Sequence, residues 1–269
     1  MYPYDLSTSL SFFAKVDHDK IKISGPINLA LSRFDVKNFS KPIFLLKHAY
    51  DLVILDSLNA RLAEYVLRPV FLTSVIEDID ETKKAYILQL IAQIGCYTKL
   101  NIKDYKGSFP KLSNYSNIDD KLVEQYQLFS YVKKDSVFIS NANKLVTRVA
   151  GSEVVCSGPI VINEGILINN CVKLSANHKF AKEENWAKFI NSNDKTFTKT
   201  AIIYVSQKNM LKNFQTAEPI RHDGVIGLKL RLLKQLGFKV ATIYDRIFNG
   251  KESSVDKLNY IKEQIYKKD

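Results

Sequence analysis

Two short apolar runs with one amphipathic helix between them constrain the fold of this chain most strongly. TAIIYVS (200–206) and GFKVATIY (237–244) are rich in β-branched and aliphatic residues, which is typical of strands buried on both faces of a sheet. The segment 224–236 between them has the periodicity of a long amphipathic helix. Because strand, helix and strand in this order usually form a right-handed crossover between parallel strands, the pattern predicts helices layered on a sheet.

Further β-branched runs begin after Lys134, namely SVFIS, KLVTRV, EVVCS, IVIN and GILINNCVKL. Each of these runs is predicted to be a strand. The chain then closes with SSVDKLNYIKEQIYKK, an amphipathic helix that Ser253 or Ser254 would cap. Residues 151–269 are therefore expected to form an α/β domain.

The first 96 residues have the pattern of successive helices separated by short breaks. The segment 43–58 follows a proline, and 60–76 should bend or break before Pro69, because the proline ring removes a helical donor. The last of these helices, 82–95, is expected to end at its glycine. The helix pairs have the size of helical-hairpin repeats of about 34–45 residues, so a short helical-repeat array is predicted.

Residues 97–150 begin with a stretch rich in Gly, Pro, Asn and Ser, which indicates a loop or linker. A helix is expected to start near Asn117, with Asp119 and Asp120 in its first turn, where the helix dipole favours acids. The predicted fold class is α+β, with a helical array (1–96), this linker region and then the α/β domain.

The chain carries a net charge of +11, an excess of cations that would attract a polyanion. Residues 199–269 contain 14 Lys and Arg against 7 Asp and Glu, a net of +7, whereas the first 198 residues contribute the other +4. Nucleic acid or an acidic membrane surface is therefore the leading partner, and the alternative is that the surface lysines serve only solubility. No run of 18 apolar residues indicates a membrane span.

The three cysteines and four histidines are scattered without the spacing of a zinc site or a disulfide framework, so neither a metal site nor a cofactor is expected. The first 20 residues contain no Arg and resemble a folded helix rather than an Arg-rich transit peptide. We therefore expect that the amino terminus is truncated or that the chain has no targeting segment.

The helix at 224–236 and the strand after it supply the candidate binding residues. Arg231 and Lys234 lie on the polar side of the helical wheel, whereas Lys229 falls in the apolar arc. Because an unpaired buried charge is costly, the side chain of Lys229 must either reach solvent at the edge of this arc or have a functional role. Single-stranded RNA is commonly bound by basic side chains on phosphate and exposed aromatic rings on bases. The predicted RNA-binding residues are Arg231, Lys234, Lys239, Tyr244 and Arg246, with Lys229, Arg221 and His222 at the margin.

The carboxy-terminal end, at about residues 200–265, resembles a RAP domain. The matching parts are a helix with Lys229 and Arg231, then Leu236-Gly237-Phe238, the strand KVATI and the helix KLNYIKEQI. In the same order, HAYDLVILDSLNARLAEYVLRPVFLTSVI and LQLIAQIGCYTKLNIKDYKGSFPKL are similar to the two conserved regions of the FAST kinase-like (FASTK) family. This resemblance implies a mitochondrial matrix protein that binds single-stranded transcripts and affects their processing or stability.

RAP domains are thought to share the fold of restriction-endonuclease-like nucleases, so a metal-dependent ribonuclease is the first alternative. Where family members often resemble Ile-Asp-x-Glu, this chain has Ile168-Asn169-Asn170-Cys171, and the nearest charges, Glu164 and Lys173, are interpreted as solvated strand-end charges. Because neutral Asn and Cys bind Mg²⁺ poorly, the chain is expected not to be a nuclease. Kinase and GxSxG motifs are also absent. A protein-interaction scaffold without RNA affinity is the second alternative.

Overall fold

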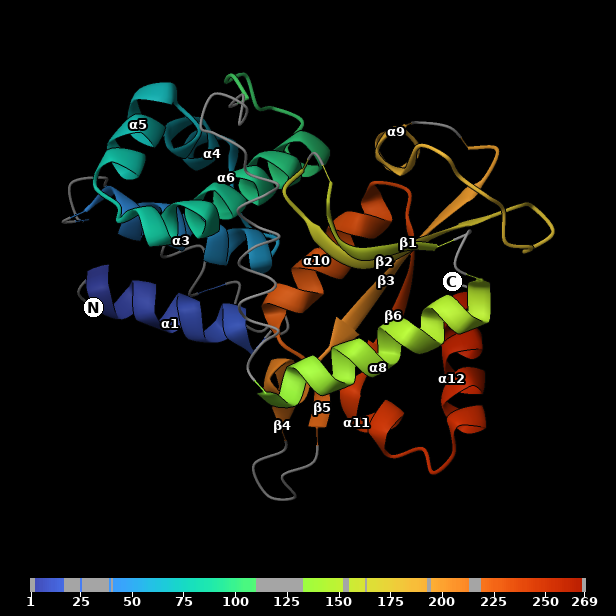
Figure 1. Cartoon of the computed structure of the whole chain (residues 1–269). Coiled ribbons are helices and arrows are strands. Elements are labelled where there is room, and N and C mark those ends of the chain that lie inside the picture. Colours follow the sequence, from blue (N-terminus) through green and yellow to red (C-terminus); the bar gives the residue numbers. More distant parts are fainter. Residues whose placement is uncertain are drawn as a thin grey trace. The chain divides into compact units, whose positions relative to one another are not determined.

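The computed structural model of the chain describes residues 3–16, 25, 39, 41–109, 133–151, 155–162, 164–192, 195–212 and 219–267. The fold is α+β, as the sequence predicts, and it combines helices with a small mixed sheet (Figure 1). The chain divides into two compact units. Unit 1 comprises Met1–Ile118 and Asp223–Lys229, and unit 2 comprises Asp119–His222 and Leu230–Asp269.

Unit 1 is helical, as predicted for the amino-terminal region. Its described residues form α1 (Pro3–Lys15), α3 (Pro42–Ile54), α4 (Ala60–Val66), α5 (Pro69–Glu77), α6 (Glu81–Asn101) and the start of α10 (Gly224–Gln235). The predicted break before Pro69 is confirmed, because α4 has ended by then and this proline occupies the first turn of α5, where a missing N–H costs nothing. The helix expected near Asn117 lies outside the described residues.

Two helix ends differ from the prediction. α6 does not end at Gly95 but continues to Asn101, because nearly all of its residues from Ala85 to Thr98 are buried and packing outweighs the low helical propensity of glycine. α3 ends at Ile54 rather than at residue 58, and the chain reverses at Asp56, whose φ of 53° lies in the left-handed region.

Unit 2 is organised around a four-stranded sheet with the order β1-β2-β3-β6. Its strands are β1 (Val155–Val161), β2 (Leu167–Leu174), β3 (Thr198–Val205) and β6 (Lys239–Tyr244). β1, β2 and β3 are antiparallel neighbours, whereas β3 and β6 are parallel, so the pairing predicted for the strand–helix–strand segment is confirmed. A second sheet pairs β4 (Met210–Lys212), which follows the short helix η4 (Gln207–Asn209), with β5 (Pro219–His222).

The prediction of strands at SVFIS and KLVTRV is wrong, because residues 133–150 form the helix α8 (Lys133–Ala150). Phe138, Ala142 and Val146 recur every four residues and are almost completely buried, which is the spacing of a helix. The β-branched residues of this segment favour a strand only locally, and the packing of an apolar stripe on the sheet overrides their propensity.

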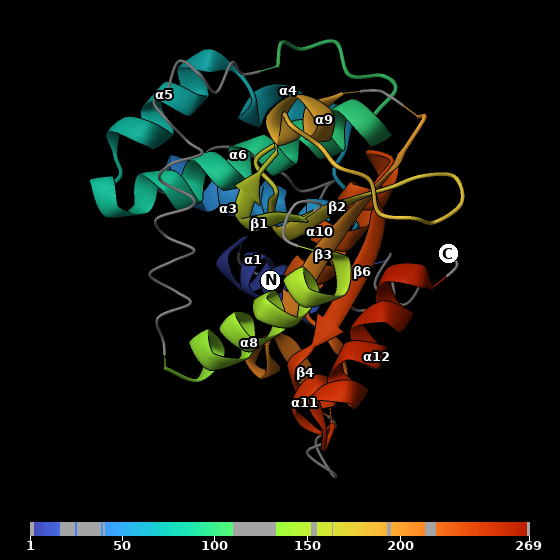
Figure 2. The ribbon, with the colours of Figure 1, turned by 45° about the vertical axis from the view of Figure 1, so that its right-hand side comes forward.

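One face of the sheet is covered by α8, α11 (Asp245–Asn249) and α12 (Ser254–Tyr266), and α10 (Gly224–Gln235) lies on the other face (Figure 2). Phe138 of α8 contacts Tyr204 and Phe248 edge to face, with ring centroids 5.9 and 5.6 Å apart. The predicted cap of the closing helix is confirmed, because the Ser253 hydroxyl accepts a hydrogen bond from the backbone N–H of Asp256.

The end of α10 shows why this helix stops where the sequence predicts. Gly237 has a φ of 84°, and its N–H donates to the carbonyl of Lys234, while the N–H of Phe238 donates to the carbonyl of Leu233. This pair of bonds is a Schellman motif, and the accompanying apolar residues, Phe238 and Leu233, are both buried. The chain therefore turns sharply into β6.

Alanine at two glycines should have opposite effects on stability. Gly237→Ala should lower the free energy of unfolding by about 1–2 kcal/mol, because an L residue is strained at a φ of 84°. Gly95→Ala should raise it by about 0.5–1 kcal/mol, because this position lies inside α6 and an added Cβ would meet nothing within 4 Å. Urea denaturation followed by far-ultraviolet circular dichroism measures both changes, and shifts of the same sign would contradict the assignment.

Candidate nucleic-acid interface

The predicted RNA-binding residues lie on four elements. Arg221 and His222 lie on β5, Lys229, Arg231 and Lys234 on α10, Lys239 and Tyr244 at the two ends of β6, and Arg246 on α11. Arg221, Lys234 and Arg246 are exposed, and the other five are partly buried. These four elements place basic side chains on more than one surface. The position of each side chain therefore decides which of them can contact one ligand together.

α10 presents two of its cations together. Arg231 and Lys234 are three residues apart and therefore lie on one side of the helix, and Lys234 lies in the last turn, where the helix dipole favours a cation. Lys229 lies on another side of α10. Burial removes water from its ammonium and so lowers the pKa of this lysine from 10.5 to about 8. The packing of α10 thus holds Lys234 in solvent and desolvates Lys229.

β6 separates Lys239 from Tyr244. These residues are five positions apart, so their side chains point to opposite faces of the sheet and their Cα atoms lie about 16 Å apart. Ala241 and Ile243 belong to the core under α8 and α12, and strand alternation places Lys239 on that same face. Tyr244 points to the other face, at the end of the strand that leads into Arg246. The predicted residues therefore do not form one continuous surface.

Tyr244 is held in place by the closing helix. Its backbone N–H donates a hydrogen bond of 3.1 Å to the hydroxyl of Tyr260 on α12, and burial raises the pKa of Tyr244. The ring of Tyr244 is only partly exposed, whereas Arg246, two residues later, is exposed. This pair offers a charged group at the surface and part of an aromatic ring beside it.

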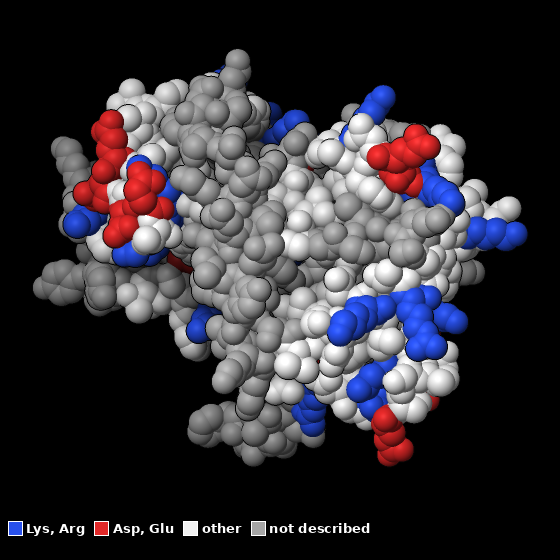
Figure 3. Space-filling view, in the orientation of Figure 1, with Lys and Arg blue, Asp and Glu red and all other residues white. Residues whose placement is uncertain are grey.

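A basic face formed by α8 and α12 was missed by the sequence analysis. Figure 3 shows Lys and Arg side chains gathered over these two helices, which pack against each other. Lys144 and Arg148 are exposed on α8 four residues apart, Lys262 is exposed on α12, and Lys257 is half-buried with its ammonium 5.3 Å from the ring centroid of Phe248. A helical wheel over residues 133–150 would have revealed the α8 part, but the assignment of strands there concealed it.

β2 carries two buried amide side chains, Asn169 and Asn170. The Asn170 side chain donates to Oδ1 of Asn143 at 2.6 Å and accepts from the hydroxyl of Tyr204 at 2.5 Å. Oδ1 of Asn169 accepts a hydrogen bond from the backbone N–H of Tyr204. The last residue pair between β2 and β3 is Asn170 with Ile202, so this bond continues the pairing just beyond the end of the ladder. Both asparagine side chains therefore complete hydrogen bonds of the sheet and its core.

Lys173 is not the solvated strand-end charge that the sequence suggested. Its ammonium lies 2.8 Å from a carboxylate oxygen of Glu183 and 4.1 Å from the ring centroid of Phe197, and its side chain is only 14% exposed. The hydrogen bond from Lys173 lowers the pKa of Glu183. Glu164 lies in the turn between β1 and β2 and is partly buried. Lys173 is therefore part of an ion pair that an aromatic ring covers.

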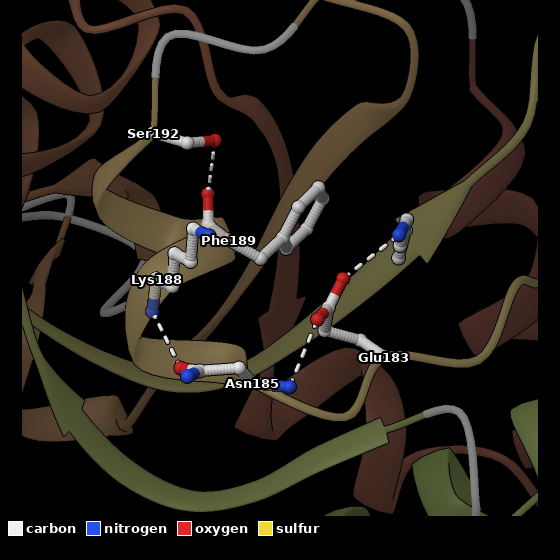
Figure 4. A network of polar contacts seen from close by, with 6 residues as sticks. Glu183, Asn185, Lys188, Phe189 and Ser192 are labelled. Atoms are coloured by element: carbon white, nitrogen blue, oxygen red, sulfur yellow. Dashed lines mark hydrogen bonds and ion pairs between the residues drawn. The ribbon is translucent and has the colours of Figure 1, made fainter.

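The same ion pair secures α9 (Trp186–Asn191) beside the sheet. Glu183 also accepts a hydrogen bond from the N–H of Asn185, whose side chain in turn caps the helix at the N–H of Lys188 (Figure 4). At the other end of α9, the buried ammonium of Lys199 donates to the carbonyls of Ile190 and Ser192, where the helix dipole favours a cation. These two lysines thus serve packing, and Lys199 is one of the 14 basic residues counted in residues 199–269.

Lys229→Met should stabilise the folded protein by about 1–2 kcal/mol at neutral pH, because it removes a desolvated ammonium. The folded-state pKa of Lys229 is lowered, so its destabilising effect is fully present below a pH of about 8 and disappears as the pH rises towards 10.5. Urea denaturation of both proteins at several pH values measures the difference. A difference that stays constant across this range would show that the ammonium is not the cause.

The described residues show neither a membrane-spanning helix nor a metal cluster. No helix among them is both long and apolar enough to cross a bilayer, and they contain no group of three or more His, Cys, Asp and Glu side chains placed to hold a metal ion. Neither a scan against protein-family models nor a search of curated proteins finds a match to this chain.

Proposed function

We propose that this chain is an RNA-binding protein of the FASTK family, that its carboxy-terminal end is a RAP domain, and that it regulates the processing or stability of mitochondrial transcripts in the matrix. The proposed ligand is single-stranded RNA, bound without catalysis. The helices of unit 1 would correspond to the helical-repeat array and could serve protein partners. The proposal rests on the sequence resemblance and on the basic character of unit 2.

The observation that carries the proposal is the arrangement of cations on the surface of unit 2. Lys144 and Arg148 are exposed on α8, and Lys239 lies on the same face of the sheet as α8 and α12. Lys234 and Arg246 are exposed on α10 and α11. Such cations attract phosphates from several directions, and a flexible single strand can follow them where a rigid duplex cannot.

The first experiment is an electrophoretic titration of the full chain with unstructured single-stranded RNA, with and without Mg²⁺, and with duplex RNA as a competitor. We expect complexes with single-stranded RNA in both conditions and no cleavage. RNA cleavage that requires Mg²⁺ would favour the ribonuclease instead. The absence of any complex at low salt would overturn the proposal and leave the protein-interaction scaffold.

Charge reversal should locate the RNA surface. Arg231→Glu with Lys234→Glu, and separately Lys144→Glu with Arg148→Glu, should each weaken RNA binding, because each pair is held on one side of its helix. For every phosphate that is no longer neutralised, the slope of log affinity against log salt should fall by ~0.7. Titrations at several salt concentrations measure both effects.

The matched control reverses Lys15 and Lys83, which are exposed on helices of unit 1. This variant changes the net charge equally and should bind RNA almost as the wild type does. Equal losses in all three variants would mean that diffuse charge, rather than a surface of unit 2, attracts the RNA. If only the α8 variant weakened RNA binding, the prediction from sequence that α10 forms the RNA surface would be wrong.

A further inference from the structure

Unit 1 contains a groove that combines aromatic walls with one cation. It has a volume of about 540 Å³ and lies where α4 gives way to α5. Phe39, Tyr65 and Phe71 contribute rings to its lining, Arg68 contributes a guanidinium, and Ser74 a hydroxyl. A cavity of this size is within the range of about 300–1,000 Å³ that is typical of small-molecule sites.

The sequence of the α4–α5 junction fixes these groups. Pro69 begins α5 and holds the preceding Arg68 in an extended conformation, with a φ of −65° and a ψ of 137°. The guanidinium carbon of Arg68 lies 5.6 Å from the ring centroid of Tyr65, and the rings of Tyr65 and Phe71 lie 5.4 Å apart at 60°. Arg68 is exposed, and its cation lies at the edge of an aromatic lining.

A smaller pocket of about 160 Å³ adjoins the groove, because Arg68 lines both. Lys106, which is exposed, and the neighbouring Gly107 and Ser108 also line this second pocket. It contains one acid, Glu64, whose carboxylate accepts a hydrogen bond from the N–H of Lys106. Two cations against one acid leave a net positive charge next to the aromatic groove.

A further aromatic ring follows the two cations. Phe109 is 46% exposed, and its ring lies 5.0 Å from that of Tyr105. The hydroxyl of Tyr105 donates to the carbonyl of Ser108 and so closes the loop that carries Lys106. The exposed ring of Phe109 thus comes directly after Lys106, Gly107 and Ser108, the loop residues that line the second pocket.

A ligand that fits this arrangement must present a flat ring, an adjacent anion and then a second flat ring. Successive nucleotides of a single strand have this composition, because each phosphate lies between two bases. Bases in a duplex are already stacked and cannot enter a groove. A peptide could supply an acid next to an apolar side chain, but the order of ring, anion and ring favours the nucleic acid.

We propose that unit 1 carries a binding site for single-stranded RNA, with a base in the groove of Phe39, Tyr65 and Phe71 and its phosphate at Arg68 and Lys106. This site is separate from the basic surface of unit 2 and deepens the proposed RNA-binding function, on which it rests. The hydroxyl of Tyr65 can meet the polar edge of the base, and that of Ser74, which donates to the carbonyl of Phe71, can still accept a hydrogen bond there.

Two variants of the full chain test the site. Arg68→Glu with Lys106→Glu should lower the affinity for single-stranded RNA at least about tenfold and reduce the log–log salt slope by ~0.7, since the phosphate between them is no longer neutralised. Val70→Glu, at a groove position that is 83% exposed, should weaken binding without disturbing the core. The control, Arg61→Glu with Lys99→Glu, reverses two exposed cations of unit 1 outside the groove and should leave the affinity nearly unchanged.

An abasic oligonucleotide of equal length separates the base from the phosphate. It should bind more weakly than RNA, and Val70→Glu should weaken it less than it weakens RNA, because no base is left to enter the groove and only the repulsion between the new carboxylate and the phosphate remains. Photocrosslinking of 4-thiouridine RNA should also label the peptide that contains Tyr65 and Phe71.

The failures of the two proposals are distinguishable. If the wild type binds RNA and the groove variants bind it equally well, the groove is not an RNA site, the basic surface of unit 2 accounts for the affinity, and an acidic peptide becomes the better occupant. If the wild type binds no RNA, both proposals fall. Equal affinity of the abasic and normal strands would also overturn the base-binding groove.

Discussion

Gly224→Ala should lower the free energy of unfolding by more than about 3 kcal/mol. A Cβ at this position would lie 1.8 Å from the carbonyl oxygen of Ala14 and 2.7 Å from a methyl group of Ile54. The oxygen belongs to the backbone of α1, so no side-chain rotation can relieve the clash. The start of α10 would have to move away from α1 and α3.

Urea denaturation followed by far-ultraviolet circular dichroism measures this loss. Val225→Ala is the matched control, because it introduces the same residue at the next position, where the side chain is 45% exposed, and should change stability by less than about 0.5 kcal/mol. Trp186, the only tryptophan of the chain, lies in unit 2 and gives a separate fluorescence signal. Equal stabilities of the two variants would contradict the close approach of the helices.

Asn170→Leu should lower the free energy of unfolding by about 2–4 kcal/mol, although leucine has a similar size and is apolar. Asn170 is completely buried and bridges Asn143 on α8 to the hydroxyl of Tyr204 on β3. Removing it leaves the amide oxygen of the partly buried Asn143 and the buried hydroxyl of Tyr204 without these partners. The loss of their hydrogen bonds exceeds the gain from burying an apolar side chain.

A double-mutant cycle tests this explanation. Tyr204→Phe alone should also destabilise the protein, but in the Asn170→Leu background it should cost much less, because the hydroxyl has already lost its acceptor. Asn141→Leu, at an exposed position on α8, is the control and should have little effect. Additive losses would mean that the two residues act independently and that the bridge does not stabilise the core.

The sequence alone determined the elements whose signal is local. The strands at 200–206 and 237–244, the helix between them and the break at Pro69 all appear in the structure. The strands are marked by continuous apolar runs, the helix by a wide apolar arc, and the element ends by glycine or proline, whose backbone properties are special. These features act within a few residues, so the local structure that they favour does not depend on the rest of the fold. The basic excess of residues 199–269 is likewise a property of the sequence.

Only the tertiary structure decided where ambiguous segments and charges lie. The residues of α8 fit a strand by propensity, and the sheet that buries Phe138, Ala142 and Val146 made them a helix. Lys173 and Lys199 are part of the packing around α9. Lys144 and Arg148 contribute to a basic face, which no short sequence motif predicts. The groove at Arg68 joins segments that are distant in sequence. Propensity describes one residue and its neighbours, but burial and charge placement depend on contacts that only the folded chain brings together.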